Sequence, residues 1–308
     1  MPVSVPGIRL KCRMETQNVV IVGAGYVGRE LALRLKTHCR VTAVVSREAS
    51  AAALAEEGLP ACVYDLDSGD TPLTARADGV IYLVPPPAHG TTDPRLARWL
   101  RTSPPPRRFV YLSTTAVYGD TGGRSVDEDA PTAPGSARGQ RRLDAEQQVQ
   151  SAAQHHGFEW TIVRVPGIYG PGRLPLERLQ KGEPVLAAVE AGLTNRIHVE
   201  DLVTALVLAV THPAAARRVY NVTDGAPCST SEHFRRVALM AGLPEPPTVR
   251  RQDADGVLSA AFLAYLDESR ALDGRRIERE LGFRPRYANP LDGIRASLPA
   301  QTGRADRS

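Results

Sequence analysis

Three glycines at a fixed spacing are the first residues in this sequence whose types could support chemistry. Gly23, Gly25 and Gly28 form a Gly-x-Gly-x-x-Gly pattern. An apolar run at 18–22 precedes the pattern and an amphipathic run at 26–37 follows it, so we expect a strand and a helix on either side. In that setting Gly23 allows a tight turn, Gly25 lets the backbone approach a pyrophosphate, and Gly28 lets the helix pack on the strand. The pattern predicts a dinucleotide site, with a glycine-rich turn that binds no ligand as the alternative.

The residues after the second predicted strand, at 41–45, bear on which dinucleotide would bind. A site selective for NAD places an acid there, which hydrogen-bonds the ribose 2′-hydroxyl. Ser46 and Arg47 occupy that place here, and a hydroxyl with a guanidinium suits a 2′-phosphate. The sequence therefore favours NADP(H) over NAD(H). A solvated surface arginine at position 47 is the alternative, because arginine accounts for 35 of the 38 Lys and Arg residues.

Strands and helices are expected to alternate around these residues. Short apolar runs predict strands at 18–22, 41–45, 62–64, 80–84, 109–112, 160–165 and 219–222. Helical patterns are expected at 26–37, 51–57, 138–154 and 231–241. This alternation predicts an α/β fold, with a doubly wound parallel sheet of the Rossmann type and a smaller C-terminal substrate lobe.

Length and punctuation divide the 308 residues into segments. We expect a flexible extension at 1–16 and an NAD(P)-binding Rossmann domain at 17–165. A smaller substrate-binding lobe is expected at 166–300, with parts that return to the Rossmann sheet, and a disordered tail at 301–308.

Composition excludes several classes of protein. A hydrophobic fraction of 42% with 23% charged residues is ordinary for a globular chain. The longest apolar run, at 202–210, is shorter than the roughly 20 residues that span a bilayer, so no membrane partner is expected. The net charge of +4 is spread along the chain, which argues against nucleic acid. Four scattered cysteines and the histidine spacing suggest neither disulfides nor a metal site, so a cytoplasmic protein is the simplest reading.

Four segments in collinear order resemble the short-chain dehydrogenase/reductase superfamily. They lie at 23–28, 113–119, 164–173 and 197–202, and the similarity extends over about residues 18–296. They look most like the extended and atypical members, the NAD(P)-dependent epimerase/dehydratase family. The resemblance implies a Rossmann lobe, a C-terminal substrate lobe, and a cofactor that lies across the strand ends.

The resemblance also implies roles for individual residues. The cofactor contacts that it implies are Tyr26 and Val27 in the glycine segment, Asp65 and Leu66 beside adenine, Leu83 and Val84 beside ribose, and Pro166 near nicotinamide. Thr114 matches the catalytic Ser/Thr, whose hydroxyl would hydrogen-bond a reacting oxygen. The alternatives are a turn residue at Asp65 and a cap of the strand end at Thr114.

The acid/base pair of the resembled family, a Tyr with a Lys four residues later, is missing. Alignment of residues 134–146 puts Arg138 at the Tyr and Arg142 at the Lys, and the chain has no Tyr-x-x-x-Lys. A guanidinium stays protonated, so Arg138 cannot shuttle a proton, whereas Arg142 could still donate to ribose hydroxyls. Tyr118 and Tyr169 are the nearby phenols that could substitute, with ordinary packing as the alternative role for each.

Three arginines suggest the class of substrate. Arg138, Arg173 and Arg196 match positions that open toward the substrate in the resembled family. Guanidinium groups bind oxyanions bidentately, so we expect a small anionic substrate, either a nucleotide-linked sugar or a small carboxylate. Surface arginines without a ligand are the alternative.

Two functions remain open at this point. The first is an NADP(H)-dependent oxidoreductase or epimerase-like enzyme with an atypical active site. The second is a catalytically silent dinucleotide-binding protein that senses redox state or acts as a scaffold, because the Tyr and Lys are missing. The helix at 138–154, where the superfamily often dimerises, has few large apolar residues, so both a monomer and a homodimer are compatible with the sequence.

Overall fold

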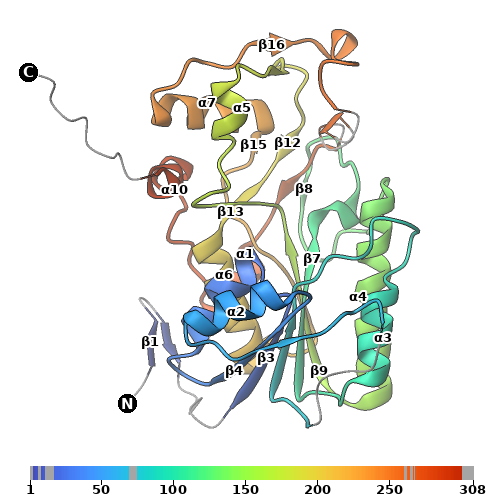
Figure 1. The fold of residues 1–308 in the computed structure, drawn as a ribbon. Helices are drawn as coiled ribbons and strands as arrows, with labels where there is room; N and C mark the ends of the chain where they lie inside the picture. The colour runs from blue at the N-terminus through green and yellow to red at the C-terminus, as the bar shows by residue number, and fades with distance from the viewer. Residues whose placement is uncertain are drawn as a thin grey trace, which may run out of the picture.

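A parallel sheet of seven strands forms the centre of the protein (Figure 1). The computed structural model describes residues 3–5, 8–10, 17–68, 75–259, 262, 263, 266 and 268–299. The strands are β3 (Asn18–Val22), β4 (Arg40–Val45), β5 (Ala61–Val63), β6 (Gly79–Tyr82), β7 (Arg108–Thr114), β9 (Glu159–Val165) and β14 (Arg218–Asn221). Their order is β14-β9-β7-β6-β3-β4-β5, with parallel pairing throughout. The Rossmann-type fold predicted from the sequence is therefore confirmed, and the strand order reverses between β3 and β6, where such folds bind ligands.

Strand β3 is buried on both faces, as its continuous apolar run indicates. Ile21 belongs to one hydrophobic core, whereas its neighbour Val22 belongs to the other, together with Trp99. The helices of the first core are α1 (Tyr26–Leu35), α2 (Glu48–Glu56), α6 (Val199–Thr211) and α9 (Arg275–Leu281), and those of the second are α3 (Pro94–Thr102) and α4 (Ala137–His156). Figure 1 shows α1, α2 and α6 on one side of the sheet and α3 and α4 on the other. The sheet is thereby held in a three-layer arrangement, with its strand ends open for a ligand.

The longest apolar run of the sequence forms most of α6. Leu202 and Leu206 are fully buried in the core that α6 shares with α1. Sequence periodicity did not mark this helix because it is apolar nearly all round and therefore lacks a polar face. Among the described residues, every helix is too short or too polar to cross a membrane.

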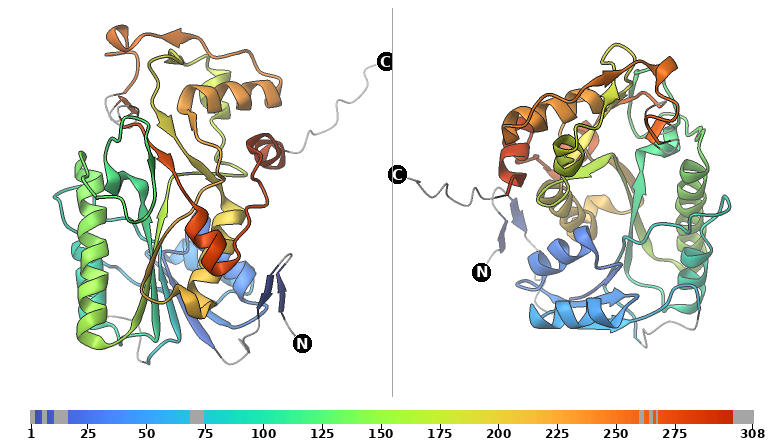
Figure 2. Two further views of the ribbon diagram at one scale, coloured as in Figure 1. Left: turned by 180° about the vertical axis from the view of Figure 1, so that it is seen from behind. Right: turned by 45° about the horizontal axis from the view of Figure 1, so that its top comes forward.

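Much of the chain after Val165 builds a group of short elements beyond the carboxyl ends of the strands (Figure 2). These elements are β10 (Gly167–Tyr169), α5 (Leu176–Gln180), β11 (Val185–Leu186), β12 (Leu193–Thr194), β13 (Arg196–His198), β15 (Cys228–Ser229), α7 (Thr230–Ala241), β16 (Thr248–Val249), η3 (Arg251–Asp253), β17 (Ala271–Leu272) and α10 (Pro290–Ser297). By contrast, η2 (Pro213–Ala215) lies near the start of β9, where Thr161 donates to the Ala215 carbonyl, and α9 (Arg275–Leu281) packs in the first core. Strands pair as β10 with β13, β11 with β16, β12 with β15, and β17 with β8 (Ser125–Val126). Helix α6 and strand β14 return to the central sheet. A domain boundary at residue 165 remains a prediction.

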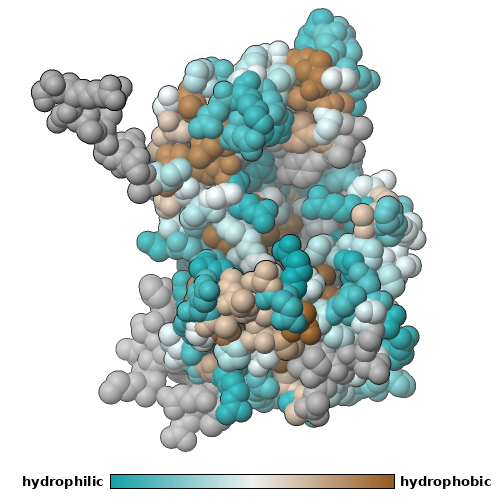
Figure 3. All heavy atoms as spheres, in the orientation of Figure 1, coloured by the Kyte–Doolittle hydropathy of each residue, from teal (hydrophilic) through white to brown (hydrophobic). Residues whose placement is uncertain are grey.

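Apolar surface gathers on the part of the molecule that α5, α7 and β16 build, at the top of Figure 3. Leu239 of α7 is 76% exposed there, and Val257 is 53% exposed. At the other end of the chain, β1 (Val3–Val5) and β2 (Ile8–Leu10) pair antiparallel inside the segment predicted to be flexible. The rest of residues 1–16 and the predicted tail at 301–308 lie outside the described residues.

A buried ion pair joins α4 to the sheet. Arg164 of β9 donates from Nη2 to Oε2 of Glu146 at 2.7 Å, and the two side chains are only 7% and 3% exposed. Arg164 also donates to the Tyr118 hydroxyl at 3.0 Å, and that hydroxyl donates to Oδ1 of Asn221 at 2.8 Å. Ser113 donates to Glu146 at 2.5 Å. This network connects α4, β7, η1 (Thr115–Tyr118), β9 and β14.

We predict that Glu146→Ala lowers the free energy of unfolding by about 3–5 kcal/mol, because it leaves the buried Arg164 guanidinium without a counter-ion. Urea unfolding followed by circular dichroism measures the change. Glu177→Ala is the control, since the Lys181–Glu177 pair is 60% and 81% exposed and contributes little. A loss at Glu146 no larger than the loss at Glu177 would contradict the prediction.

Candidate active site

The turn between β3 and α1, residues 23–28, is named the glycine turn here. Gly23 has a φ of +92°, and a Cβ on it would lie 2.7 Å from Cγ2 of Val84. A Cβ on Gly28 would lie 2.5 Å from the carbonyl oxygen of Gly23, so only glycine lets α1 begin this close to the strand. A Cβ on Gly25 would meet no atom within 4 Å. The space beside Gly25 is therefore open, as a passing pyrophosphate requires.

A cavity of about 160 Å³ lies at the ends of β3, β4 and β5. Gly23, Ser46, Asp65, Leu66 and Val84, all predicted cofactor residues, line it. Leu83 packs against the glycine turn: a Cβ added to Gly28 would lie 3.2 Å from Cδ1 of Leu83. The cavity thus brings together the two strand ends that the sequence assigns to adenine and ribose.

The polar groups of this cavity are mostly engaged with one another. The Asp65 carboxylate accepts hydrogen bonds from the Asp67 backbone at 3.0 Å and the Ser68 hydroxyl at 2.8 Å, and these bonds lower the pKa of Asp65. Arg95 donates to both carboxylate oxygens of Asp67, from Nε at 2.7 Å and from Nη2 at 2.5 Å. Arg47 is exposed at the N-cap of α2. Asp65 therefore forms a turn with Asp67 and Ser68, which is the alternative role that the sequence left open for it.

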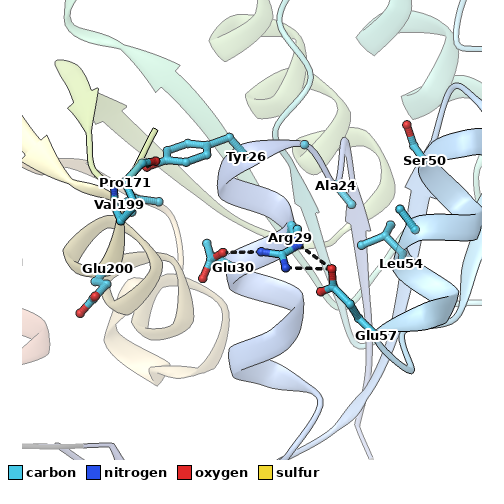
Figure 4. A pocket seen from close by; sticks show the side chains of 12 residues that line it. Ala24, Tyr26, Arg29, Glu30, Ser50, Leu54, Glu57, Pro171, Val199 and Glu200 are labelled. Atoms are coloured by element: carbon cyan, nitrogen blue, oxygen red, sulfur yellow. Dashed lines mark hydrogen bonds and ion pairs between the residues drawn. The ribbon is translucent and has the colours of Figure 1, made fainter. Parts of the chain in front are cut away.

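A second cavity, of about 480 Å³, lies between α1, α2 and the start of α6 (Figure 4). Gly25 and Tyr26 form one wall of it. The Tyr26 hydroxyl donates to the Pro171 carbonyl at 3.1 Å, and the Arg173 guanidinium lies 4.7 Å from the centre of the Tyr26 ring. Arg173 therefore lies beside the glycine turn, and its predicted contact with the substrate is not seen in this arrangement.

A third cavity, of about 330 Å³, is named the reaction cavity here because it collects the predicted catalytic groups. Thr114 at the end of β7, Arg138 at the start of α4 and Pro166 after β9 all line it. Its other lining residues are Thr115, Ala116, Ser136, Gly167, Thr194, Glu268 and Arg270. Thr114 also accepts a long hydrogen bond of 3.4 Å from the Ala116 backbone, so it caps η1 while it faces the cavity.

Arg142 is tied to the sheet. Its Nη1 donates to the Leu112 carbonyl at 2.7 Å and to the Tyr111 hydroxyl at 3.1 Å. The guanidinium thus binds the end of β7 one helical turn from Arg138. A contact with a cofactor ribose stays a prediction.

The two phenols considered as substitutes for the missing acid do not line the reaction cavity. Tyr118 is 2% exposed and bonded into the network around Arg164, and burial raises its pKa to about 12. Tyr169 is also 2% exposed, and its ring packs edge-on against His198 and His233, with ring centres 5.3 and 5.8 Å away. Both side chains pack in the interior, which is the alternative role that the sequence left open for each.

Arg196 is likewise buried, with 7% of its surface exposed. It donates to the Asn195 carbonyl at 3.1 Å and to the Thr230 hydroxyl at 3.2 Å. Its guanidinium lies against Gly167, whose added Cβ would be 3.1 Å from Nη1. The side chain therefore packs against Gly167, which lines the reaction cavity, and a contact of Arg196 with substrate stays a prediction.

Sequence reasoning missed Glu268 and Arg270 in the reaction cavity. It also missed Arg95 in the cavity of about 160 Å³ at the ends of β3, β4 and β5, which is named the adenine-side cavity here. Glu268 and Arg270 lie more than 100 residues from the other catalytic candidates and form no recognisable motif. Helix α3, which carries Arg95, begins with an Asp93 cap and Pro94. That pair is a helix-start signal that could have located it.

A glycine turn of this geometry at the first strand of a doubly wound parallel sheet defines a dinucleotide-binding Rossmann protein. The NAD dependent epimerase/dehydratase family matches residues 19–223, and the chain belongs to that family.

Three known proteins illustrate the similarity. Protein YeeZ of Escherichia coli (strain K12) is 27% identical over 288 residues, which cover 89% of this chain and 98% of YeeZ. The structure of a functionally unknown conserved protein from Silicibacter pomeroyi DSS has a TM-score of 0.78 at 30% identity, covering 91% of this chain and 98% of that one. MoeE5, solved in complex with UDP-glucuronic acid and NAD, has a TM-score of 0.69 at 25% identity. The match covers 91% of this chain and 97% of the MoeE5 chain.

The residues present fit a nicotinamide dinucleotide. The space beside Gly25 is open, the N-terminus of α1 begins there, and cavities lie on both sides of the turn. Free N–H groups at a helix start are suited to a pyrophosphate.

We predict that Gly25→Val abolishes NADPH binding while the ligand-free protein keeps its melting temperature, because the new side chain enters open space that the pyrophosphate needs. Fluorescence titration and thermal unfolding measure the two effects. Gly28→Ala is the contrasting variant: its methyl group meets the Gly23 carbonyl, so it should lose about 1–3 kcal/mol of stability. Unchanged NADPH affinity in Gly25→Val would refute the assignment of the turn.

Proposed function

We propose that the protein is an NADP(H)-dependent oxidoreductase or epimerase-type enzyme that acts on a small anionic substrate. The observation that carries this proposal is the meeting of Thr114, Arg138 and Pro166 in one cavity at the carboxyl ends of the strands. A bound nicotinamide would supply hydride transfer to or from a carbon that bears oxygen. The chain itself would supply orientation and charge.

Each residue of the reaction cavity has a role that follows from its chemistry. The Thr114 hydroxyl can donate a hydrogen bond to the reacting oxygen of the substrate. Arg138 is exposed toward the cavity mouth and permanently charged, so it binds an anionic group and moves no proton. Arg142, held by the Leu112 carbonyl, fixes the start of α4 against the end of β7. These roles give the site binding and positioning without the usual phenol.

The preference for NADP(H) rests on the strand end at β4. Ser46 lines the adenine-side cavity, and Arg47 follows it at the start of α2. Position 46 holds no carboxylate that would repel a 2′-phosphate. Asp65 and Asp67 also line this cavity, but Arg95 pairs with Asp67 and local hydrogen bonds occupy Asp65. The Ser46 hydroxyl and the Arg47 guanidinium, beside carboxylates that are already engaged, support a site that accepts a phosphate.

We predict that NADPH binds about 10–100-fold more tightly than NADH, because Ser46 and Arg47 make charge-assisted bonds to the 2′-phosphate. Arg47→Ala should remove most of the difference and leave NADH affinity unchanged. Arg40→Ala is the matched control, since this exposed arginine lies at the opposite end of β4. Equal affinities of the unmodified protein for the two cofactors, measured by fluorescence titration, would sink the proposed preference.

The substrate class is supported by the charge of the cavity and by one relative. MoeE5 has been solved with UDP-glucuronic acid, a nucleotide sugar that carries a carboxylate. We extend this chemistry to the present chain as a nucleotide-linked sugar, with a small carboxylate as the second possibility. We also place the protein in the reducing cytoplasm, where its free buried thiols Cys39 and Cys228 would persist.

A second candidate function is a catalytically silent dinucleotide-binding protein that senses redox state or acts as a scaffold. The observation that favours it is the burial of Tyr118 and Tyr169, which leaves the reaction cavity without a phenol among its lining residues. Turnover of NADPH with a panel of UDP-sugars and carboxylates separates the two functions. Cofactor binding with no turnover across the panel would favour the silent protein.

We predict that Arg138→Ala raises the KM for the substrate about 10–100-fold and leaves kcat nearly unchanged, because Arg138 binds an anion and transfers no proton. Steady-state kinetics on the best substrate of the panel measure both constants. Arg141→Ala is the control: Arg141 lies on the same helix but donates to the Gly90 carbonyl at 2.8 Å. A fall in kcat with KM intact would instead give Arg138 a role in the transition state.

A further inference from the structure

An ion pair between Glu268 and Arg270, two residues late in the sequence, lines the reaction cavity. Arg270 donates from Nη1 to Oε2 of Glu268 at 2.9 Å, and its Nη2 contacts the same oxygen. The two side chains are 9% and 14% exposed, and both line the cavity with Thr114 and Arg138. Arg270 also donates to the Gly119 carbonyl at 2.8 Å. The pair is therefore nearly buried, yet it forms part of the wall that a substrate would touch.

The backbone under this pair is held by several hydrogen bonds. The Ser269 carbonyl accepts from the Thr121 and Gly123 backbones, each at 3.0 Å. The Ser269 N–H donates to the Asp120 carboxylate at 2.9 Å, and the Arg270 N–H donates to the Leu193 carbonyl at 2.9 Å. Glu268 and Arg270 are thus presented to the cavity from a fixed segment.

The charges of the cavity do not balance. Arg138, Arg270 and Glu268 are the charged side chains among the described residues that line it, which leaves one positive charge in excess. The ion pair of the cavity joins Arg270 to Glu268, and Arg138 is exposed. A substrate anion that enters is therefore attracted by two guanidinium groups, one nearly buried and one exposed, and repelled by one carboxylate.

We propose that Glu268 is a resting counter-ion of Arg270, and that a carboxylate of the substrate, such as one on its sugar, takes its place, so that Arg270 and Arg138 bind this carboxylate together. The inference rests on the proposed function, since it treats the cavity as the substrate site. Glu268 lowers the cost of the nearly buried Arg270 charge before the substrate binds. A substrate without a carboxylate at this point cannot make the exchange and leaves the pair closed.

Charge removal at Glu268 tests the exchange. Isothermal titration of the NADPH-loaded protein would compare UDP-glucuronate with UDP-glucose, which share a nucleotide and differ in the charge of the sugar. Glu268→Gln should bind UDP-glucuronate about 10-fold more tightly than the unmodified protein does, with the affinity for UDP-glucose changed less than about 2-fold. Arg270→Gln should weaken UDP-glucuronate about 10-fold or more. Glu183→Gln, in the half-exposed Arg178–Glu183 pair, is the control and should change neither affinity.

Several outcomes would overturn the exchange. A general loosening of the cavity by Glu268→Gln predicts an equal gain for both UDP-sugars, and that result would overturn the exchange. No gain for UDP-glucuronate, or no binding of UDP-glucuronate and free glucuronate to either the unmodified protein or Glu268→Gln, also refutes it. Should Arg270→Gln fail to fold, because Arg270 anchors the Gly119 carbonyl, the comparison at Glu268 decides alone. NADPH titration distinguishes failure of the exchange from failure of the proposed function. If the unmodified protein binds NADPH and Glu268→Gln has no effect, only the exchange is refuted. If the unmodified protein does not bind NADPH, the proposed function is refuted.

Discussion

The buried contact between Arg164 and Glu146 sets the geometry on which the reaction cavity depends. Arg164 is the penultimate residue of β9, close to Pro166, and Glu146 lies on α4 two turns after Arg138. The same guanidinium reaches Tyr118, in the short helix that starts beside Thr114. Three walls of the cavity are therefore tied to one ion pair. A shift of α4 along the sheet would break charge-assisted bonds at several atoms at once, so the pair fixes the register of helix and strand.

The glycine turn applies a second constraint at the other side of the strand ends. Gly28 brings α1 so close to β3 that the carbonyl of Gly23 fills the space a side chain would take. This contact directs the N-terminus of α1 toward open space beside Gly25. The two constraints act on opposite faces of the sheet, because α1 belongs to one hydrophobic core and α4 to the other. The strand ends between them are consequently held by close packing on both faces.

Local patterns predicted the central sheet and the glycine turn. The seven strands of the sheet were predictable because each contains a short apolar run, and the glycine turn because its spacing is read directly from the chain. Tyr118 and Tyr169 misled because a loop residue at a strand end looks the same in sequence whether it points into a cavity or into the core. Arg270 and Glu268 could not be found, since only the folded chain pairs β17 with β8 and brings Arg270 to the Gly119 carbonyl. Coding bias toward arginine further hid which guanidinium groups face a ligand.

Arg142 carries a consequence for how a substitution at its position would act. Its guanidinium donates to the Leu112 carbonyl and to the buried Tyr111 hydroxyl, so the side chain supports the end of β7. A shorter or neutral side chain at position 142 would remove both bonds at once. Stability and the position of α4 beside the reaction cavity are therefore coupled at this one residue, and a change made to alter binding would also alter the support of the sheet.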